Sequence, residues 1–115
     1  MAEKITGAVM VIGGGIGAIQ ASLDLADSGY KVYLVEKNPS IGGVMAQLDK
    51  TFPTNDCSMC IMSPKLVEVG RHRNIELVTM AEIKGVRGEK GAFEVDVHQK
   101  ARYIDMSKCI ACGQC

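Results

Sequence analysis

The stretch that decides the fold is AVMVIGGGIGAIQASLDLADSGYKVYLVEK, residues 8–37. It opens on an apolar run without alternation, residues 8–12, which predicts a strand covered on both faces. Apolar residues then recur at helical spacing from Ile16 through Leu23, and Gly29 predicts the end of that helix. A second apolar run, residues 31–37, predicts a second strand. Strand, helix and strand in this order predict a βαβ unit with parallel strands.

A glycine motif joins the first predicted strand to the helix. Gly13, Gly15 and Ala18 fit the pattern G-x-G-x-x-[G/A]. The first residue allows a tight turn, the second lets the backbone approach a diphosphate, and the third lets the helix pack close to the sheet. Free N–H groups and the dipole at the helix N-terminus favour an anion there. The motif predicts a dinucleotide site, and the alternative is a glycine turn that serves packing alone.

Glu36 supports the dinucleotide interpretation. It ends the second strand eighteen residues after Ala18, where a carboxylate accepts hydrogen bonds from ribose hydroxyls. A carboxylate repels a 2′-phosphate, which disfavours NADP and leaves FAD and NAD.

A second glycine pair, Gly42-Gly43, follows Glu36 and favours FAD. An acidic strand end followed by such a pair resembles the FAD site of the thioredoxin reductase and glutathione reductase group, and the alternative is a simple loop turn. The predicted FAD-binding residues are Gly13, Gly15, Ile16, Gly17, Ala18, Glu36, Lys37, Gly42 and Gly43.

The elements predicted beyond the second glycine pair are shorter. Residues 44–50 predict a short helix, and residues 51–60 predict a loop. Residues 62–72 predict another short helix, with Ser63 as its N-cap and Pro64 at its first position. Strands are predicted over residues 74–80 and 101–105, and a hairpin is predicted within residues 82–100 around the turn 87–91. The predicted fold class is α/β: a Rossmann-like βαβ unit with a β-hairpin or meander, as an incomplete domain.

Three cysteines close the chain at two-residue gaps. Cys109, Cys112 and Cys115 form C-x2-C-x2-C, the opening of the ferredoxin run that holds [4Fe–4S] clusters through thiolates. Zinc also accepts four thiolates, but three cysteines in a row at x2 gaps suit a cubane cluster better than a zinc ribbon. We therefore predict the start of an iron–sulfur site here, with zinc or free thiols as the alternatives.

Cys57 and Cys60 form a second group with the same gap. Three interpretations stay open: a redox dithiol, a pair of cluster ligands, and cysteine used as a small buried hydrophobe. Cys57 follows Gly43 by fourteen residues, which is further than the redox cysteines of glutathione reductase-type enzymes lie from their glycine pair. No other side chain is an evident catalytic residue.

Composition limits the class of protein. The 115 residues carry 13 basic and 13 acidic side chains, so the formal net charge is zero, and a nucleic-acid or anionic-membrane partner is not expected. No apolar run approaches the roughly 20 residues of a membrane span, and the first residues lack a signal peptide. Five clustered cysteines favour metal or redox chemistry in the cytoplasm over structural disulfides.

Taken together, residues 11–66 and the segment KCIACGQC closely resemble the A subunit of heterodisulfide reductase. They are also similar to the flavoprotein of the quinone-interacting membrane-bound oxidoreductase complex. The segment TNDCSMC, residues 54–60, carries more of this resemblance than the glycine motif does. The resemblance implies an electron-transfer protein of anaerobes with FAD and a ferredoxin-type [4Fe–4S] cluster. It also implies other subunits of the same complex as partners, which carry the heterodisulfide chemistry.

Family members of this kind are several times longer, so the chain is expected to be an N-terminal part of one. Residues 1–104 would be the first half of the FAD-binding domain, and residues 105–115 the start of the iron–sulfur motif. Two other functions compete with this one. One is a non-catalytic Rossmann-like fragment with a zinc-binding cysteine tail, and the other is a dithiol oxidoreductase that uses Cys57 and Cys60.

Overall fold

The structure is a computed structural model that describes residues 7–115. Residues 1–6, where the predicted domain begins, lie outside the described residues. The elements in chain order are β1 (Ala8–Ile12), α1 (Ile16–Asp27), β2 (Lys31–Val35), the 3-10 helix η1 (Val44–Gln47), β3 (Lys50–Thr51), β4 (Asp56–Cys57), α2 (Ser58–Arg71), β5 (Ile75–Val78), β6 (Ala81–Glu89) and β7 (Ala92–Gln99).

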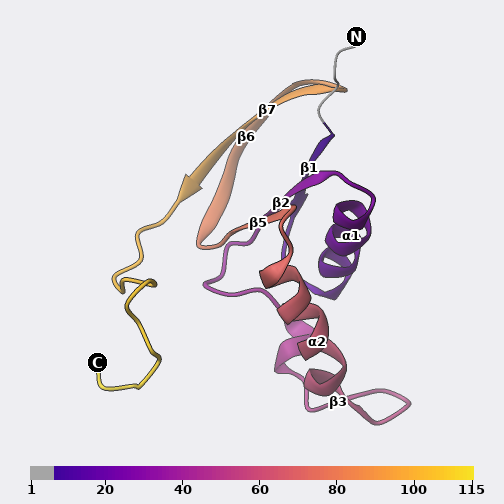
Figure 1. Cartoon of the computed structure of the whole chain (residues 1–115), viewed down its shortest axis with the longest axis vertical. Helices are drawn as coiled ribbons and strands as arrows, with labels where there is room; N and C mark the ends of the chain where they lie inside the picture. The colour runs from indigo at the N-terminus through magenta and orange to yellow at the C-terminus, as the bar shows by residue number, and fades with distance from the viewer. Residues whose placement is uncertain (1–6) are drawn as a thin grey trace.

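The sheet confirms the predicted βαβ unit and extends it by one strand. Its order is β1-β2-β5, and both pairings are parallel, with Leu34 opposite Val11 on one side and Leu77 on the other. Each parallel connection contains one α-helix, the usual form of a crossover between parallel strands. Figure 1 shows the three strands side by side, with α1 and α2 on the same side of them.

The hydrophobic core lies between β2 and the two helices. Fully buried side chains come from α1, β2 and α2, and a nearly buried one comes from β5; the cluster consists of Ile19, Leu23, Ala26, Val32, Leu34, Met62, Val69 and Ile75. The prediction that the first strand is covered on both faces was wrong. All five residues of β1 are half-buried or exposed, and Ile12 is 63% exposed, because the helices cover one face only.

The second long helix begins earlier than predicted. Cys57 is its N-cap and Pro64 lies inside it, so the prediction of a start at Ser63 was wrong. The buried or core-packed residues of α2 are Ser58, Met62, Leu66 and Val69. Their spacing is helical from residue 58 onward, and burial of this face outweighs the backbone hydrogen bond lost at proline.

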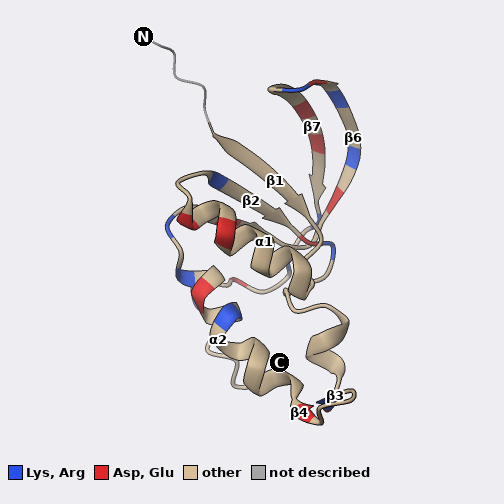
Figure 2. Cartoon of the chain, turned by 90° about the vertical axis from the view of Figure 1, so that its right-hand side faces the viewer, with Lys and Arg blue, Asp and Glu red and all other residues tan. Residues whose placement is uncertain are grey.

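The β6/β7 hairpin forms as predicted and extends away from the core (Figure 2). Its antiparallel register has one irregularity, between Ile83 and Gly85. The predicted strand over residues 101–105 is not present, because that segment has no partner strand among residues 7–115, and Tyr103 is 97% exposed. Within the same range, the helices are too short or too polar to cross a membrane.

Candidate dinucleotide site and cysteine groups

The glycine turn between β1 and α1 is tight and leaves the helix N-terminus open. Gly13 has φ +102°, and its N–H donates to the carbonyl oxygen of Val35 at 2.7 Å. Gly15 is the N-cap of α1; its first turn has no side-chain cap and no acidic residue. A Cβ built at Gly13, Gly15 or Gly17 would meet no atom within 4 Å. The first amides of α1 therefore face a surface that an anion can approach.

Glu36 is held against this turn from the end of β2. Its side chain is among the buried polar groups, at 6% exposure. Oε2 accepts the N–H of Gly14 at 3.2 Å, and Oε1 accepts the N–H of Lys37 at 2.7 Å. A carboxylate offers about four acceptor positions, so Glu36 retains acceptor capacity for a ligand hydroxyl beside the turn.

Gly14 is a site residue that the motif analysis missed. It is buried, and a Cβ there would lie 3.0 Å from Oε2 of Glu36 and 2.9 Å from Cγ2 of Ile41. Only glycine fits this position without moving the carboxylate. The run of three glycines was the available signal, because the motif itself requires only the first and the third of them.

The second glycine pair packs directly on the first turn. The N–H of Gly42 donates to the carbonyl oxygen of Gly14 at 2.7 Å. Gly43 has φ +62°, and a Cβ there would lie 2.9 Å from Cα of Gly15. The structure thus brings the two predicted glycine segments into backbone contact, although 28 positions separate Gly15 from Gly43.

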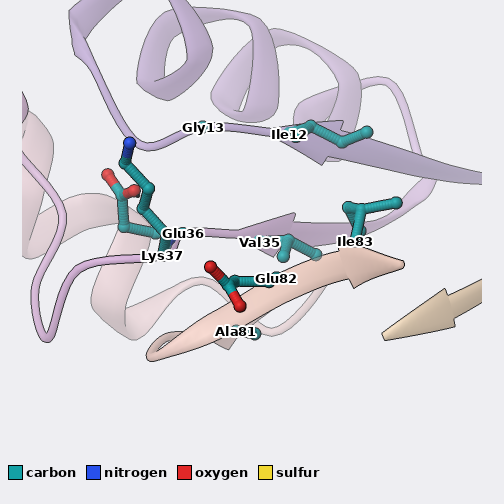
Figure 3. Close-up of a pocket in the computed structure, with 8 residues that line it drawn as sticks. All are labelled: Ile12, Gly13, Val35, Glu36, Lys37, Ala81, Glu82 and Ile83. Atoms are coloured by element: carbon teal, nitrogen blue, oxygen red, sulfur yellow. Dashed lines mark hydrogen bonds between the residues drawn. The ribbon is translucent and has the colours of Figure 1, made fainter. Parts of the chain in front are cut away.

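A pocket of about 300 Å³ adjoins Glu36 (Figure 3). It lies between the carboxyl ends of β1 and β2 and the start of β6, and it is lined by Ile12, Gly13, Val35, Glu36, Lys37, Ala81, Glu82 and Ile83. A hydrogen bond from Lys84 and the charge of Lys100 hold the pKa of Glu82 below its ordinary value. Two carboxylates beside apolar walls suit a ring that carries hydroxyl groups and disfavour an additional phosphate.

The remaining predicted FAD residues surround the same turn. Ile16 and Ala18 pack against the core and fix the first turn of α1. Gly17 is exposed, and Lys37 is exposed beside the pocket. All nine predicted positions thus belong to three neighbouring segments: the turn with the start of α1, the end of β2, and the pair at residues 42–43.

Cys109, Cys112 and Cys115 are not brought together as a metal site. All three are free and exposed, and within residues 7–115 no group of three His, Cys, Asp or Glu side chains is placed to hold a metal ion. They line an open cavity of about 500 Å³. A preformed site rarely exists before its metal binds, because the metal–thiolate bonds themselves assemble it.

The base of this cysteine tail is tied to the dinucleotide loop by Arg102, which sequence reasoning missed. Its guanidinium donates to the carbonyl oxygen of Pro39 at 2.9 Å and to the hydroxyl of Thr79, and it contacts the sulfur of Met106 at 3.8 Å. Pro39 follows Glu36 by three residues. No local pattern reveals such a contact, because its partners are far apart in the sequence.

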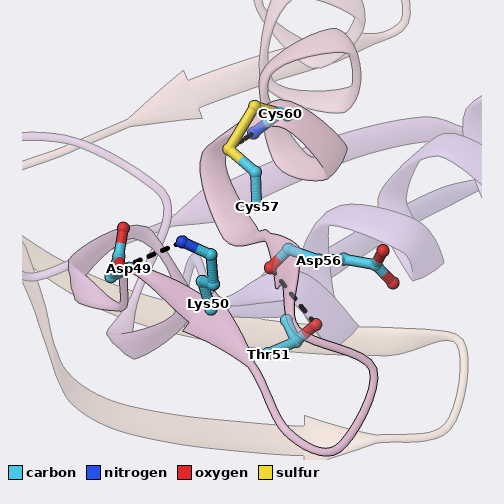
Figure 4. Close-up of a disulfide and its surroundings, with 6 residues drawn as sticks. All are labelled: Asp49, Lys50, Thr51, Asp56, Cys57 and Cys60. Carbon is cyan, nitrogen blue, oxygen red and sulfur yellow. Dashed lines mark hydrogen bonds and ion pairs between the residues drawn. A yellow bond between two sulfur atoms is a disulfide. The ribbon is translucent and has the colours of Figure 1, made fainter.

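Cys57 and Cys60 form a disulfide at the first turn of α2 (Figure 4). Their Cα atoms are 5.2 Å apart, and the N–H of Cys60 donates to Sγ of Cys57 at 3.1 Å. Both residues are exposed, so the interpretation as buried small hydrophobes was wrong. The redox and cluster-ligand interpretations remain.

Comparison with known proteins places the chain among flavoproteins. Residues 8–56 match the family of FAD-dependent oxidoreductases. The chain is 62% identical over 106 residues to the A subunit of the H(2):CoB-CoM heterodisulfide,ferredoxin reductase of Methanothermobacter marburgensis, covering 92% of this chain and 16% of that protein. It is 60% identical over 106 residues to the iron-sulfur A subunit of the CoB--CoM heterodisulfide reductase of Methanocaldococcus jannaschii, covering 92% of this chain and 16% of that one.

Solved structures support the fold. L-proline dehydrogenase from P. horikoshii matches with a TM-score of 0.64 and 27% identity, over 84% of this chain and 20% of that enzyme. Histamine dehydrogenase from Rhizobium sp. 4-9 matches with a TM-score of 0.56 and 22% identity, over 70% of this chain and 12% of that enzyme, and it bears on the fold alone. The chain thus spans about one sixth of the curated relatives it matches.

Proposed function

The chain belongs to the family of heterodisulfide reductase A subunits, and on that premise we propose that it is the FAD-binding segment of a flavin- and iron–sulfur-containing electron-transfer subunit. The observation that carries this proposal is the contact between the two glycine turns with Glu36 held beside them. Open helix amides, close packing that only glycine permits at Gly14 and Gly43, and a carboxylate with acceptor capacity are the parts that an ADP moiety requires. FAD, when bound, supplies hydride or single-electron exchange at its ring.

Each segment of the site has a distinct role in this proposal. The amides at the start of α1 bind the diphosphate, and Gly13 and Gly15 let it approach the backbone. Glu36 accepts hydrogen bonds from the ribose hydroxyls. Gly42 and Gly43 hold the second turn against the first, so the backbone groups that would bind the diphosphate are fixed relative to one another.

We place an iron–sulfur cluster on Cys109, Cys112 and Cys115, with its remaining ligand outside this set. The exposed cysteines at x2 gaps support a cubane over zinc, and the names of three of the relatives include the term iron-sulfur. The other subunits of such a complex are the proposed partners. A cytoplasmic location is proposed with them, because clustered cysteines at metal-ligand spacing are typical of a reducing compartment.

FAD titration of the anaerobically purified polypeptide tests the first half of the proposal. Glu36→Gln is expected to weaken FAD binding about tenfold or more, because a hydrogen bond to a charged group contributes about 1.5–3 kcal/mol. Glu68→Gln, on the exposed side of α2, is the matched control and is expected to bind FAD like the parent. Equal affinity in Glu36→Gln, with folding unchanged by circular dichroism, would contradict the assignment of Glu36.

Metal analysis tests the second half independently. The parent polypeptide is expected to contain iron and acid-labile sulfide in equal amounts, and Cys112→Ser is expected to lose both without losing FAD. Zinc without sulfide in the parent would instead favour a zinc-binding tail, and it would leave the FAD result standing.

A further inference from the structure

We propose that Cys57 and Cys60 form a reversible redox site that exchanges two electrons with thiols and disulfides, with Cys57 as the reacting sulfur. The proposal rests on the geometry of the first turn of α2 and goes beyond FAD and cluster binding. Its substrates are small or protein-borne disulfides in one direction and dithiols in the other.

The helix places the two sulfur atoms for this exchange. Residues at positions i and i+3 lie on the same face of a helix, and Cys57 as N-cap brings its sulfur to Cys60 in the first turn. Both residues are exposed, so an incoming thiol can reach the bond. Cys112 and Cys115 have the same spacing in the tail but are free. Spacing alone therefore does not produce the disulfide, and the helical turn does.

The surroundings favour the thiolate form of Cys57 once the pair is reduced. Its sulfur accepts the N–H of Cys60 at 3.1 Å, and it lies at the positive end of the dipole of α2, whose first turn contains no acidic residue. Lys50 lies opposite Cys57 in the β3/β4 pair. The other charged groups there are Asp49, whose Oδ2 is 3.5 Å from Nζ of Lys50, and Asp56, which precedes Cys57.

Electrons and protons balance in this exchange with thiols and disulfides as the only reactants. A substrate dithiol attacks Sγ of Cys57 as a thiolate; the bond between the two cysteines breaks, and Cys60 leaves as a thiolate that takes up a proton. The second substrate thiolate then attacks the substrate sulfur of the mixed disulfide and releases Cys57. The substrate loses two electrons and two protons, the protein gains them, and the reverse reaction reduces a substrate disulfide.

The variant Cys57→Ser separates the reactivity of the sulfur from the stability of the helix. Serine is a preferred N-cap residue, so Cys57→Ser removes the reacting atom and keeps an acceptor for the amide of Cys60. The next residue, Ser58, has a buried hydroxyl and is left unchanged. Loss of reactivity in this variant therefore reports the sulfur, and circular dichroism confirms that α2 persists.

The test uses the full polypeptide, reduced and metal-free, with iodoacetamide and 5,5′-dithiobis(2-nitrobenzoate) as probes. At neutral pH Cys57 is expected to be alkylated about tenfold faster than Cys60 or the three tail cysteines Cys109, Cys112 and Cys115, as followed by peptide mass spectrometry. Cys60→Ser is expected to trap a mixed disulfide on Cys57, and Cys57→Ser to lose about tenfold or more of the exchange rate. In a glutathione redox buffer the parent pair is expected to open and close reversibly.

Three results would overturn the proposal. The first is equal alkylation of all five thiols, and the second is a pair that does not re-form in the redox buffer. The third is a loss of iron from Cys57→Ser after cluster reconstitution, which would assign the two cysteines as ligands. Cys112→Ser is the reference for the iron measurement, because it is expected to lose iron without changing thiol exchange at Cys57.

Discussion

The sheet with its two helices has a core of its own, whereas the hairpin and the cysteine tail have none. Within residues 7–115, every buried residue lies between Gly14 and Ala81. Beyond Ala81 the side chains are half-buried at most. The difference shows that the first region is specified by its own apolar pattern. The order of the hairpin and the cysteine tail depends on their attachment to the first region and on any molecule that they bind.

The hairpin makes this dependence plain. Its register places apolar residues on one face, which we call the hairpin face: Ile83, Val86, Phe93, Val95 and Val97. Phe93 is 64% exposed on that face, and Val86 is 54% exposed. The opposite face carries the ion pair between Arg87 and Asp96, with atoms 2.7 Å apart. A two-stranded ribbon is marginal by itself, so its base contacts with the sheet decide whether it is ordered.

The largest expected effect comes from making the same substitution, valine to alanine, in each of the two regions. Val32 is fully buried in β2, and Val97 is 38% exposed in β7. Val32→Ala is expected to lower the free energy of unfolding by about 2 kcal/mol, because it removes buried methyl groups and leaves a cavity. Val97→Ala is expected to change it by less than about 0.5 kcal/mol. Chemical denaturation measures both, and equal losses would mean that the hairpin face is part of the core.

The parts that were predicted from sequence are those that local pattern determines. In residues 8–37 the apolar spacing of consecutive positions indicates each strand and helix directly. Glycines likewise indicate the hairpin turn. The start of α2 was misplaced because Ser63-Pro64 is a strong local signal, whereas the deciding signal is the spacing of Ser58, Met62 and Val69. That spacing identifies the buried face of α2 only once the face of α1 that packs against it is known.

The residues of the candidate site follow from sequence motifs, whereas the contacts among them do not. Gly13, Gly15 and Glu36 follow from a motif, but Gly14 matters because Glu36 and Ile41 come to it from more than twenty residues away. The disulfide depends on a helix that starts one residue after Cys57. The cysteine tail could be predicted only as a candidate ligand set, since the fold of residues 7–115 does not bring its thiols together.

An intermediate effect tests the contact between the two glycine turns. Gly43→Ala adds a Cβ 2.9 Å from the backbone of Gly15 at a φ of +62°. It is expected to cost about 1–2 kcal/mol of stability and to weaken FAD binding, because the second turn must move off the first. Gly70→Ala is the control: a Cβ at this α2 position has open space, so a gain of about 0.5–1 kcal/mol is expected. Losses of the same size in both variants would contradict the packing described.

The smallest expected effect concerns Arg102, which joins the two regions. Arg102→Met keeps the apolar stem and removes the donors to Pro39 and Thr79. The guanidinium is charged but lies at the surface, where solvent limits its hydrogen bonds to about 1 kcal/mol, so the tail amides should exchange about fivefold faster. Those of Lys108 and Cys109, which donate to the carbonyl of Asp105 at 3.0 Å, are the amides to follow. Arg73→Met, at an exposed position after α2, should leave them unchanged.

Because no core residue contributes to this attachment, the global unfolding midpoint should stay constant while tail exchange rises. A fall in the midpoint with no change in exchange would show instead that the tail is held by the core.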